Sequence, residues 1–286
     1  MPFQYCLNAS TIRGTPLLEQ IRVAAAAGYD AIEFWAADVE AHLAAGGKLA
    51  EVAHALDDAG LRRPSMISLR GWWATDEAAW LAASDEIRRR LEMAAGLGVT
   101  RIVAGPPREE IAPLAIAERY QQLLDLSLEY GVPASLEFLG FVPSFATLEV
   151  AWLVCQLADH PAATITLDAW HLFRGGSDPD AVAALAPERI SIVHWDDAPA
   201  DVPREEQTDA DRVMPGDGML DLAGLGRQLQ AMGWSGFLSL ELFHAGYWAQ
   251  DPLEVARLGL AKMRHSVRDC PPSIRVGDGG SARPTT

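Results

Sequence analysis

Lysine is scarce in this chain, which has only two, Lys48 and Lys262. Neither lysine lies at the end of a predicted strand. A Schiff-base mechanism needs a desolvated lysine inside the active-site pocket. Cysteine is scarce too: Cys6, Cys155 and Cys270 are odd in number and widely separated, and their spacing does not suggest a zinc site. These shortages exclude Schiff-base chemistry and argue against a disulfide scaffold.

Positive charge and long apolar runs are also lacking. Lysine and arginine together number 23 against 39 aspartates and glutamates, which gives a formal net charge of −16. Because proteins bind nucleic acids largely by neutralising phosphates with basic side chains, we expect no nucleic-acid partner. No run is long enough to cross a bilayer, and residues 1–6 lack the basic region and apolar core of a signal peptide. We therefore expect a cytoplasmic protein with no membrane partner, and leave self-association open.

The chain alternates short apolar runs with helical patterns over its 286 residues. Strands are expected near residues 3–8, 31–35, 63–69, 100–104, 134–138, 163–168, 190–195 and 237–242. Helices are expected near residues 15–28, 48–59, 76–97, 147–158, 179–185, 222–232 and 252–267, with another that ends near 130, and residues 36–47 read as a loop. This alternation predicts an α/β protein, a single-domain (β/α)8 TIM barrel over residues 1–270. Residues 271–286 are rich in proline, glycine and serine, and we expect a flexible tail.

Four successive predicted strands end in a potential metal ligand: Glu137, Asp168, His194 and Glu241. In this barrel class the carboxyl ends of the strands form the active-site face, so these side chains are expected to converge. A single glutamate at a strand end is usually a structural group, but four tips on consecutive strands favour a divalent-metal site. The mostly oxygen ligand set suits Mn²⁺, Mg²⁺ or Co²⁺, and the imidazole is also compatible with Zn²⁺. A metal-bound carboxylate there can accept a proton from a substrate.

Three further polar residues are candidates for substrate contacts. His171 follows the Asp168 strand tip, where it either contacts a substrate oxygen or packs beside Asp168. Arg212 lies in a glycine-rich loop, where its guanidinium either holds a substrate oxygen or orders the loop through a salt bridge to Asp209 or Asp211. Glu33, at the tip of the second strand, is expected to form part of the pocket wall, with an ion-paired or solvated role equally open.

Tryptophans accumulate at the same predicted strand ends. Some must be ordinary packing, but so many flat rings near one rim favour a substrate with an apolar sugar face or an aromatic group to stack. Trp170 is placed among the substrate-binding candidates. The tryptophans at or just beyond predicted strand ends are Trp35, Trp72, Trp73, Trp170, Trp195 and Trp248.

Several short segments resemble the sugar isomerase/epimerase superfamily of xylose-isomerase-like barrels, and most closely its inosose isomerase branch. The likeness runs from about Ala134 to the end of the last helix. The resemblance implies that Glu137, Asp168, His194 and Glu241 bind one divalent metal, for which Mn²⁺ is favoured. It also implies that His171 and Arg212 touch substrate and that Glu137 and Glu241 carry protons. The matching segments are residues 136–140, 167–171, 194–197, 211–218 and 239–243.

The implied chemistry is removal of a proton beside the ketone of a keto-polyol or keto-sugar, a metal-stabilised cis-enediolate, and return of the proton. The lack of a pocket lysine agrees with proton transfer rather than the lysine-assisted hydride shift of xylose isomerase. Ketose 3-epimerases of the superfamily usually carry a glutamate where this chain has Pro143, which counts against that activity.

Three alternatives remain. A lyase of the same superfamily, such as an inosose or 3-dehydroshikimate dehydratase or a 3-keto-glycoside-cleaving enzyme, begins with the same proton abstraction. An apurinic-site endonuclease of shared barrel ancestry needs a richer histidine and acidic cluster and a basic face, and the net charge of −16 counts against it. A non-catalytic protein that has kept its metal is disfavoured because both glutamates are present.

Overall fold

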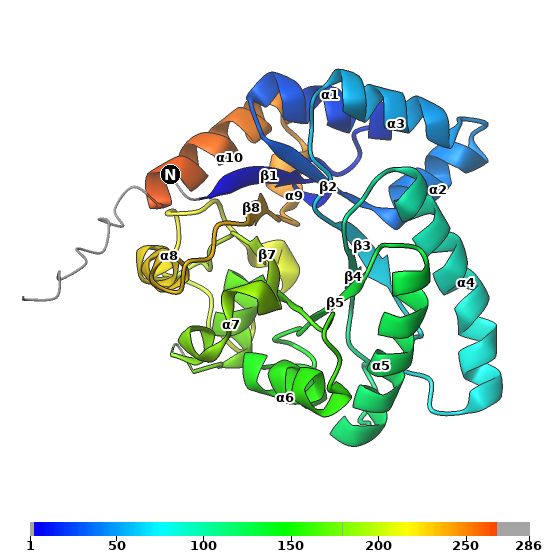
Figure 1. Ribbon diagram of the computed structural model, residues 1–286. Coiled ribbons are helices and arrows are strands. Elements are labelled where there is room, and N and C mark those ends of the chain that lie inside the picture. The colour runs from blue at the N-terminus through cyan, green and yellow to red at the C-terminus, as the bar shows by residue number, and fades with distance from the viewer. Residues whose placement is uncertain (1–2, 179, 268–286) are drawn as a thin grey trace, which may run out of the picture.

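Eight parallel strands form a closed barrel in sequence order in the computed structural model, which describes residues 3–178 and 180–267 (Figure 1). The predicted (β/α)8 fold is confirmed. The predicted tail, residues 271–286, and the last residues of the predicted domain lie outside the described residues. The strands are β1 Gln4–Asn8, β2 Ala31–Trp35, β3 Met66–Leu69, β4 Ile102–Ala104, β5 Ala134–Glu137, β6 Ile165–Asp168, β7 Ile190–His194 and β8 Phe237–Leu240.

Helices surround the barrel on its outside (Figure 1). None of the described helices is both long and apolar enough to span a bilayer. The α-helices are α1 Leu17–Ala27, α2 Ala36–Ala44, α3 Leu49–Asp58, α4 Glu77–Gly96, α5 Pro113–Glu129, α6 Leu148–Ala158, α7 Ala169–Gly175, α8 Leu222–Ala231, α9 Ala245–Trp248 and α10 Pro252–Ser266. Short 3-10 helices span Ala9–Ile12, Pro143–Phe145, Ala181–Ala184, Pro187–Arg189 and Asp209–Asp211.

Two sequence predictions were wrong, and two further α-helices, α7 and α9, were missed. The predicted loop 36–47 is mostly helix α2, which begins directly after β2 without a capping side chain, so no start signal marks it. The predicted helix 179–185 is only a 3-10 turn at Ala181–Ala184. Helix α7 forms directly after β6 because the Asp168 side chain accepts a hydrogen bond from the backbone N–H of His171.

The strand ends bring the predicted ligands to one face. Strands β5, β6 and β7 end at Glu137, Asp168 and His194, and Glu241 directly follows β8. In the sheet, Asp168 is in register with His194, and His194 with Ser239. Nearly every strand residue is buried, so the polar side chains at these tips lie above a packed core.

Candidate metal centre

The four predicted ligands converge as the sequence predicted. Glu137, Asp168, His194 and Glu241 each offer a ligand atom, and these atoms all lie within 4.8 Å of one another. All four side chains are buried. Three carboxylates and one imidazole at this separation form a donor set that a single divalent cation can share.

His194 shows how well the cluster fits a cation. Its Nδ1 lies 3.1 Å from Glu137 Oε1, 3.1 Å from Glu241 Oε2 and 3.5 Å from Asp168 Oδ2. Nδ1 nevertheless makes no hydrogen bond, although it is buried. On the other side of the ring, Nε2 lies 3.1 Å from Glu33 Oε2. A proton on Nε2 therefore leaves the Nδ1 lone pair directed at the carboxylates, which is the arrangement of a metal-binding histidine.

The electrostatics of the cluster also call for a cation. Burial penalises the charged imidazolium, but Glu241 and Glu33 outweigh this and raise the pKa of His194 well above its ordinary value. Burial raises the pKa of Glu137 to about 7; His194 opposes the increase, and the neighbouring Glu241 and Asp168 add to it. So much negative charge in a buried site is costly unless cations compensate it.

Asp168 serves the cluster and the local fold together. Its Oδ1 accepts a hydrogen bond of 2.6 Å from the backbone N–H of His171, and its Oδ2 accepts one of 2.7 Å from Arg212. Burial alone would raise its pKa, but the charge of Arg212 together with the neighbouring His171 and His194 lowers it. Asp168 is therefore held ionised, with its orientation fixed by the start of helix α7.

Arg212 connects the long loop after β7 to the metal-ligand cluster. Its Nη1 donates hydrogen bonds to Asp168 Oδ2 at 2.7 Å, Asp196 Oδ2 at 2.5 Å and Glu241 Oε2 at 3.0 Å. Its Nη2 donates to Asp209 at 2.7 Å. The guanidinium is buried yet lines the cavity above the cluster. The loop-ordering salt bridge to Asp209 is present in the structure, while contact of Arg212 with a substrate oxygen stays a prediction.

His171 also lines this cavity. Its Nδ1 accepts a hydrogen bond of 3.1 Å from the backbone N–H of Gly140, and its Nε2 lies 3.1 Å from Arg212 Nη2. Burial lowers its pKa to about 4, and Arg212 acts in the same direction against the opposing charge of Asp168. A neutral imidazole next to a guanidinium is suited to hydrogen-bonding a substrate oxygen, and that contact stays a prediction.

Glu33 and Trp170 lie behind the cavity wall and are not among the residues that line it. Glu33 is fully buried, where its Oε2 accepts hydrogen bonds from Asn8 at 2.8 Å and Ser239 at 2.7 Å. The Trp170 ring lies 4.8 Å from the guanidinium carbon of Arg212. These contacts position His194 and Arg212, while direct substrate contact by either residue stays a prediction.

Two acidic residues in the site were not assigned a role from the sequence. Asp196 accepts a hydrogen bond of 3.0 Å from the backbone N–H of Trp170 as well as the one from Arg212. Asp197 accepts hydrogen bonds from four backbone N–H groups, including those of Gly216 and Gly218, and so holds the loop that carries Arg212. Their position directly after the His194 strand tip was the available signal.

A cavity of about 380 Å³ opens above the cluster. Glu137 and Glu241 form part of its wall, so two of the four ligands are reachable from it. Of the six tryptophans expected at the rim, Trp35 and Trp73 line this cavity. The other aromatic side chains in the lining are Phe141 and Phe243. The site therefore combines a polar floor with aromatic walls, which suits the apolar faces of a sugar or cyclic polyol.

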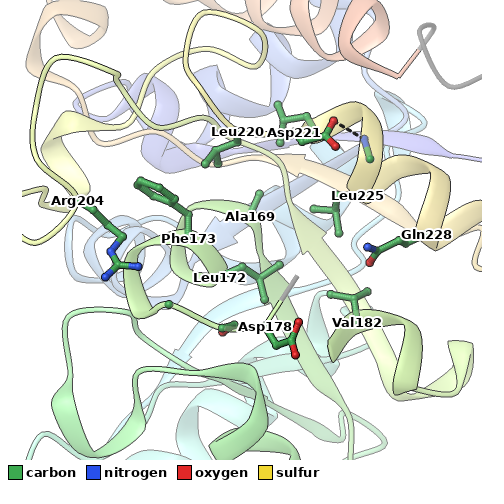
Figure 2. Close-up of a pocket in the computed structure, with 14 residues that line it drawn as sticks. Ala169, Leu172, Phe173, Asp178, Val182, Arg204, Leu220, Asp221, Leu225 and Gln228 are labelled. Carbon is green, nitrogen blue, oxygen red and sulfur yellow. Dashed lines mark hydrogen bonds between the residues drawn. The ribbon is translucent and has the colours of Figure 1, made fainter. Parts of the chain in front are cut away.

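A second cavity, of about 450 Å³, lies outside the barrel beside α7 and α8 (Figure 2). Its walls are mainly apolar, with Leu172, Phe173 and Leu225 among them. The Asp221 carboxylate at its edge accepts a hydrogen bond of 2.8 Å from Gly224 and caps α8 (Figure 2). None of the four metal-ligand candidates lines it, so we place the chemistry in the smaller cavity inside the barrel mouth.

Residues 21–265 match the xylose isomerase-like TIM barrel family. The chain belongs to this family and is an enzyme of the xylose isomerase-like superfamily. An inosose isomerase of Bacillus velezensis is 27% identical over 264 residues, which cover 88% of this chain and 94% of that one. A 3-dehydroshikimate dehydratase of Pseudomonas putida is 26% identical over 91% of this chain, but the match spans only 41% of that longer protein.

A solved structure, described as the IolI protein with a bound zinc atom, superposes with a TM-score of 0.86 at 25% identity. The match covers 95% of this chain and all of that one. The buried ligand cluster and the zinc of this neighbour together support a divalent-metal site in this chain.

Proposed function

We propose that this protein is a divalent-metal-dependent isomerase or epimerase that moves a proton next to the ketone of a cyclic polyol or sugar. The proposal rests on the location of Glu137 and Glu241, which meets two requirements at once. Both belong to the four-residue ligand cluster, and both line the cavity above it. The inosose isomerases that match over most of the chain support the same reaction class.

In this proposal a metal bound by Glu137, Asp168, His194 and Glu241 would polarise the ketone oxygen and acidify the adjacent C–H bond. Glu137 and Glu241, from β5 and the end of β8, carry the proton between neighbouring carbons or between the faces of one carbon. Arg212 and His171 hold the substrate oxygens. Of the candidate metals, Mn²⁺ is proposed first because the donors are mostly oxygen, with Co²⁺, Mg²⁺ and Zn²⁺ as alternatives.

A lyase is the second candidate, and the 3-dehydroshikimate dehydratase of Pseudomonas putida is the finding that favours it. Both reactions begin when a glutamate removes the proton beside the carbonyl. A lyase then expels a β-substituent, so its product is lighter than the substrate, whereas an isomerase gives a product of equal mass. A cytoplasmic location, self-association and the lack of nucleic-acid and membrane partners stay predictions from the sequence.

The test is to incubate the Mn²⁺-loaded protein with 2-keto-inositols in deuterated water. We expect solvent deuterium in the product at the carbon next to the ketone, with the product mass separating isomerase from lyase. E241Q should lower the rate of exchange by about 100-fold or more while the folded state remains. The control D38N changes a carboxyl on α2 outside the cluster and should leave exchange unchanged. No exchange with any keto-polyol would overturn the proposal.

A further inference from the structure

Two arginines at the barrel cavity have side chains that make neither a hydrogen bond nor an ion pair within the part of the chain that the structure describes. Arg70 follows β3, Arg108 lies in the loop after β4, and both line the cavity. Neither makes a hydrogen bond or ion pair within residues 3–178 and 180–267. Of the carboxylates that line this cavity, Glu109 and Asp209 lie outside the ligand cluster, and neither pairs with Arg70 or Arg108 within the described residues; Asp209 pairs with Arg212 instead.

This arrangement is unusual in so acidic a protein. With 39 aspartates and glutamates, partners for a guanidinium are abundant, and most described arginines form a hydrogen bond or an ion pair. Arg90, for example, pairs with Glu40 and Glu86, and Arg119 with Glu77. Within the described ranges, the arginines whose side chains make neither a hydrogen bond nor an ion pair are Arg13, Arg70, Arg108 and Arg264. Arg70 and Arg108 line one cavity, and Arg13 lies over Trp35 and Phe243, which line the same cavity.

Aromatic side chains of the cavity hold two of these arginines. The guanidinium carbon of Arg108 lies 5.7 Å from the Phe141 ring centroid, and the Phe141 ring lies 5.5 Å from that of His171. The guanidinium carbon of Arg13 lies 5.6 Å from the rings of both Trp35 and Phe243. Stacking engages the flat face of a guanidinium and leaves its N–H groups free at the edge, which is suited to binding an oxyanion.

We propose that the substrate carries an anionic group, a carboxylate or a phosphate, on the part of the molecule that lies away from the ketone. Arg70 and Arg108 bind this group at the cavity mouth, and Arg13 adds attraction from across the rim. The orientation rests on the proposed function, which places the ketone at the floor near Glu137 and Glu241. Charge-assisted hydrogen bonds of this kind are among the strongest in proteins and fix the orientation of a substrate.

The test measures binding, so it does not depend on turnover. Calorimetric titration of the Mn²⁺-loaded protein compares shikimate with its methyl ester, a pair that differs in the anionic charge and has no ketone. We expect shikimate to bind about tenfold more tightly than the ester, with the difference shrinking as salt is added. R70Q and R108Q should each remove most of this preference and leave ester binding unchanged. myo-Inositol 1-phosphate against myo-inositol provides the phosphate comparison, and the larger preference identifies the anion.

The matched control is R264Q. The side chain of Arg264 also makes no hydrogen bond or ion pair within the described residues, but it lies on α10 over the ring of Tyr5. Its substitution should leave the preference intact. Equal affinity for the charged and neutral member of both pairs, or a preference that survives both R70Q and R108Q, would overturn the inference. Failure of deuterium exchange with both neutral and anionic keto-polyols, together with a retained anion preference, would instead overturn the proposed function alone.

Discussion

Nε2 of His194 lies 3.1 Å from Oε2 of Glu33, and neither side chain is exposed. Glu33 thus fixes the imidazole so that Nδ1 faces the other three ligand candidates. The charge of His194 in turn lowers the pKa of Glu33 although burial acts to raise it, so the carboxylate stays ionised. Glu33 therefore belongs to the metal centre through His194, even though it does not line the cavity.

We predict that E33Q weakens metal binding by about tenfold or more, because partners that orient a ligating histidine typically contribute this much. Calorimetric titration of the metal-free protein with Mn²⁺ measures the effect. The control D38N, on α2, removes a carboxyl that has no contact with His194 and should bind Mn²⁺ like the wild type. Unchanged affinity in E33Q would contradict the assigned positioning role.

Metal should stabilise the folded chain. A ligand that binds only the folded state at 100 times its dissociation constant adds about 2.7 kcal/mol to the free energy of unfolding. We predict that Mn²⁺ raises the melting temperature, that a chelator reverses the rise, and that H194Q abolishes it. Thermal denaturation followed by circular dichroism measures this effect. An identical metal-dependent rise in H194Q would show that the metal binds elsewhere.

The metal-free protein should lose stability as the pH rises. Burial raises the pKa of Glu137 from 4.5 to about 7 in the folded state. Below about pH 4.5, Glu137 is protonated in the folded and the unfolded chain. Between the unfolded pKa of 4.5 and the folded pKa of about 7, only the folded chain keeps this proton. The stabilisation is therefore lost as the pH rises through about 7. Between about pH 5 and about pH 8 the free energy of unfolding should fall by up to about 3 kcal/mol relative to E137Q. Urea denaturation of both proteins after chelation tests this prediction, and parallel pH profiles would contradict it.

Gly175, the last residue of α7, has no room for a side chain. A Cβ there would lie 1.8 Å from the backbone oxygen of Ala146 and 3.2 Å from Gly140 Cα. We predict that G175A lowers the free energy of unfolding by about 3 kcal/mol, since backbone cannot move aside as a flexible side chain can. The matched control is G105A, where a Cβ would meet no atom within 4 Å. Urea denaturation should show a much smaller change in the control.

The sequence predicted the strands and their polar ends because both depend on local patterns. A buried run that ends in Glu137, Asp168 or His194 leaves a charged group that only the open face of a barrel can accommodate. It could not predict helix α2, because Ala36–Ala44 follows β2 with neither a loop nor a capping residue between them.

The sequence did not predict which distant segments contact one another. Glu33 and His194 are separated by 161 positions, and the spacing of residues does not indicate that they meet. Arg212 was found as a candidate because of its glycine-rich loop, but its link to Asp196 depends on how that loop folds back over the cavity. Tertiary packing alone determines such pairs.

The loop that carries Arg212 is attached to the barrel largely through Asp197, which accepts hydrogen bonds from its backbone at Gly216, Gly218 and Leu220. In the proposed mechanism, Glu137 and Glu241 at the strand ends carry the proton, and this loop supplies the guanidinium of Arg212. Because Arg212 and the strand-end carboxylates come from separate segments, a change in the sequence of this loop can alter the groups that face the cavity and leave the strand ends in place.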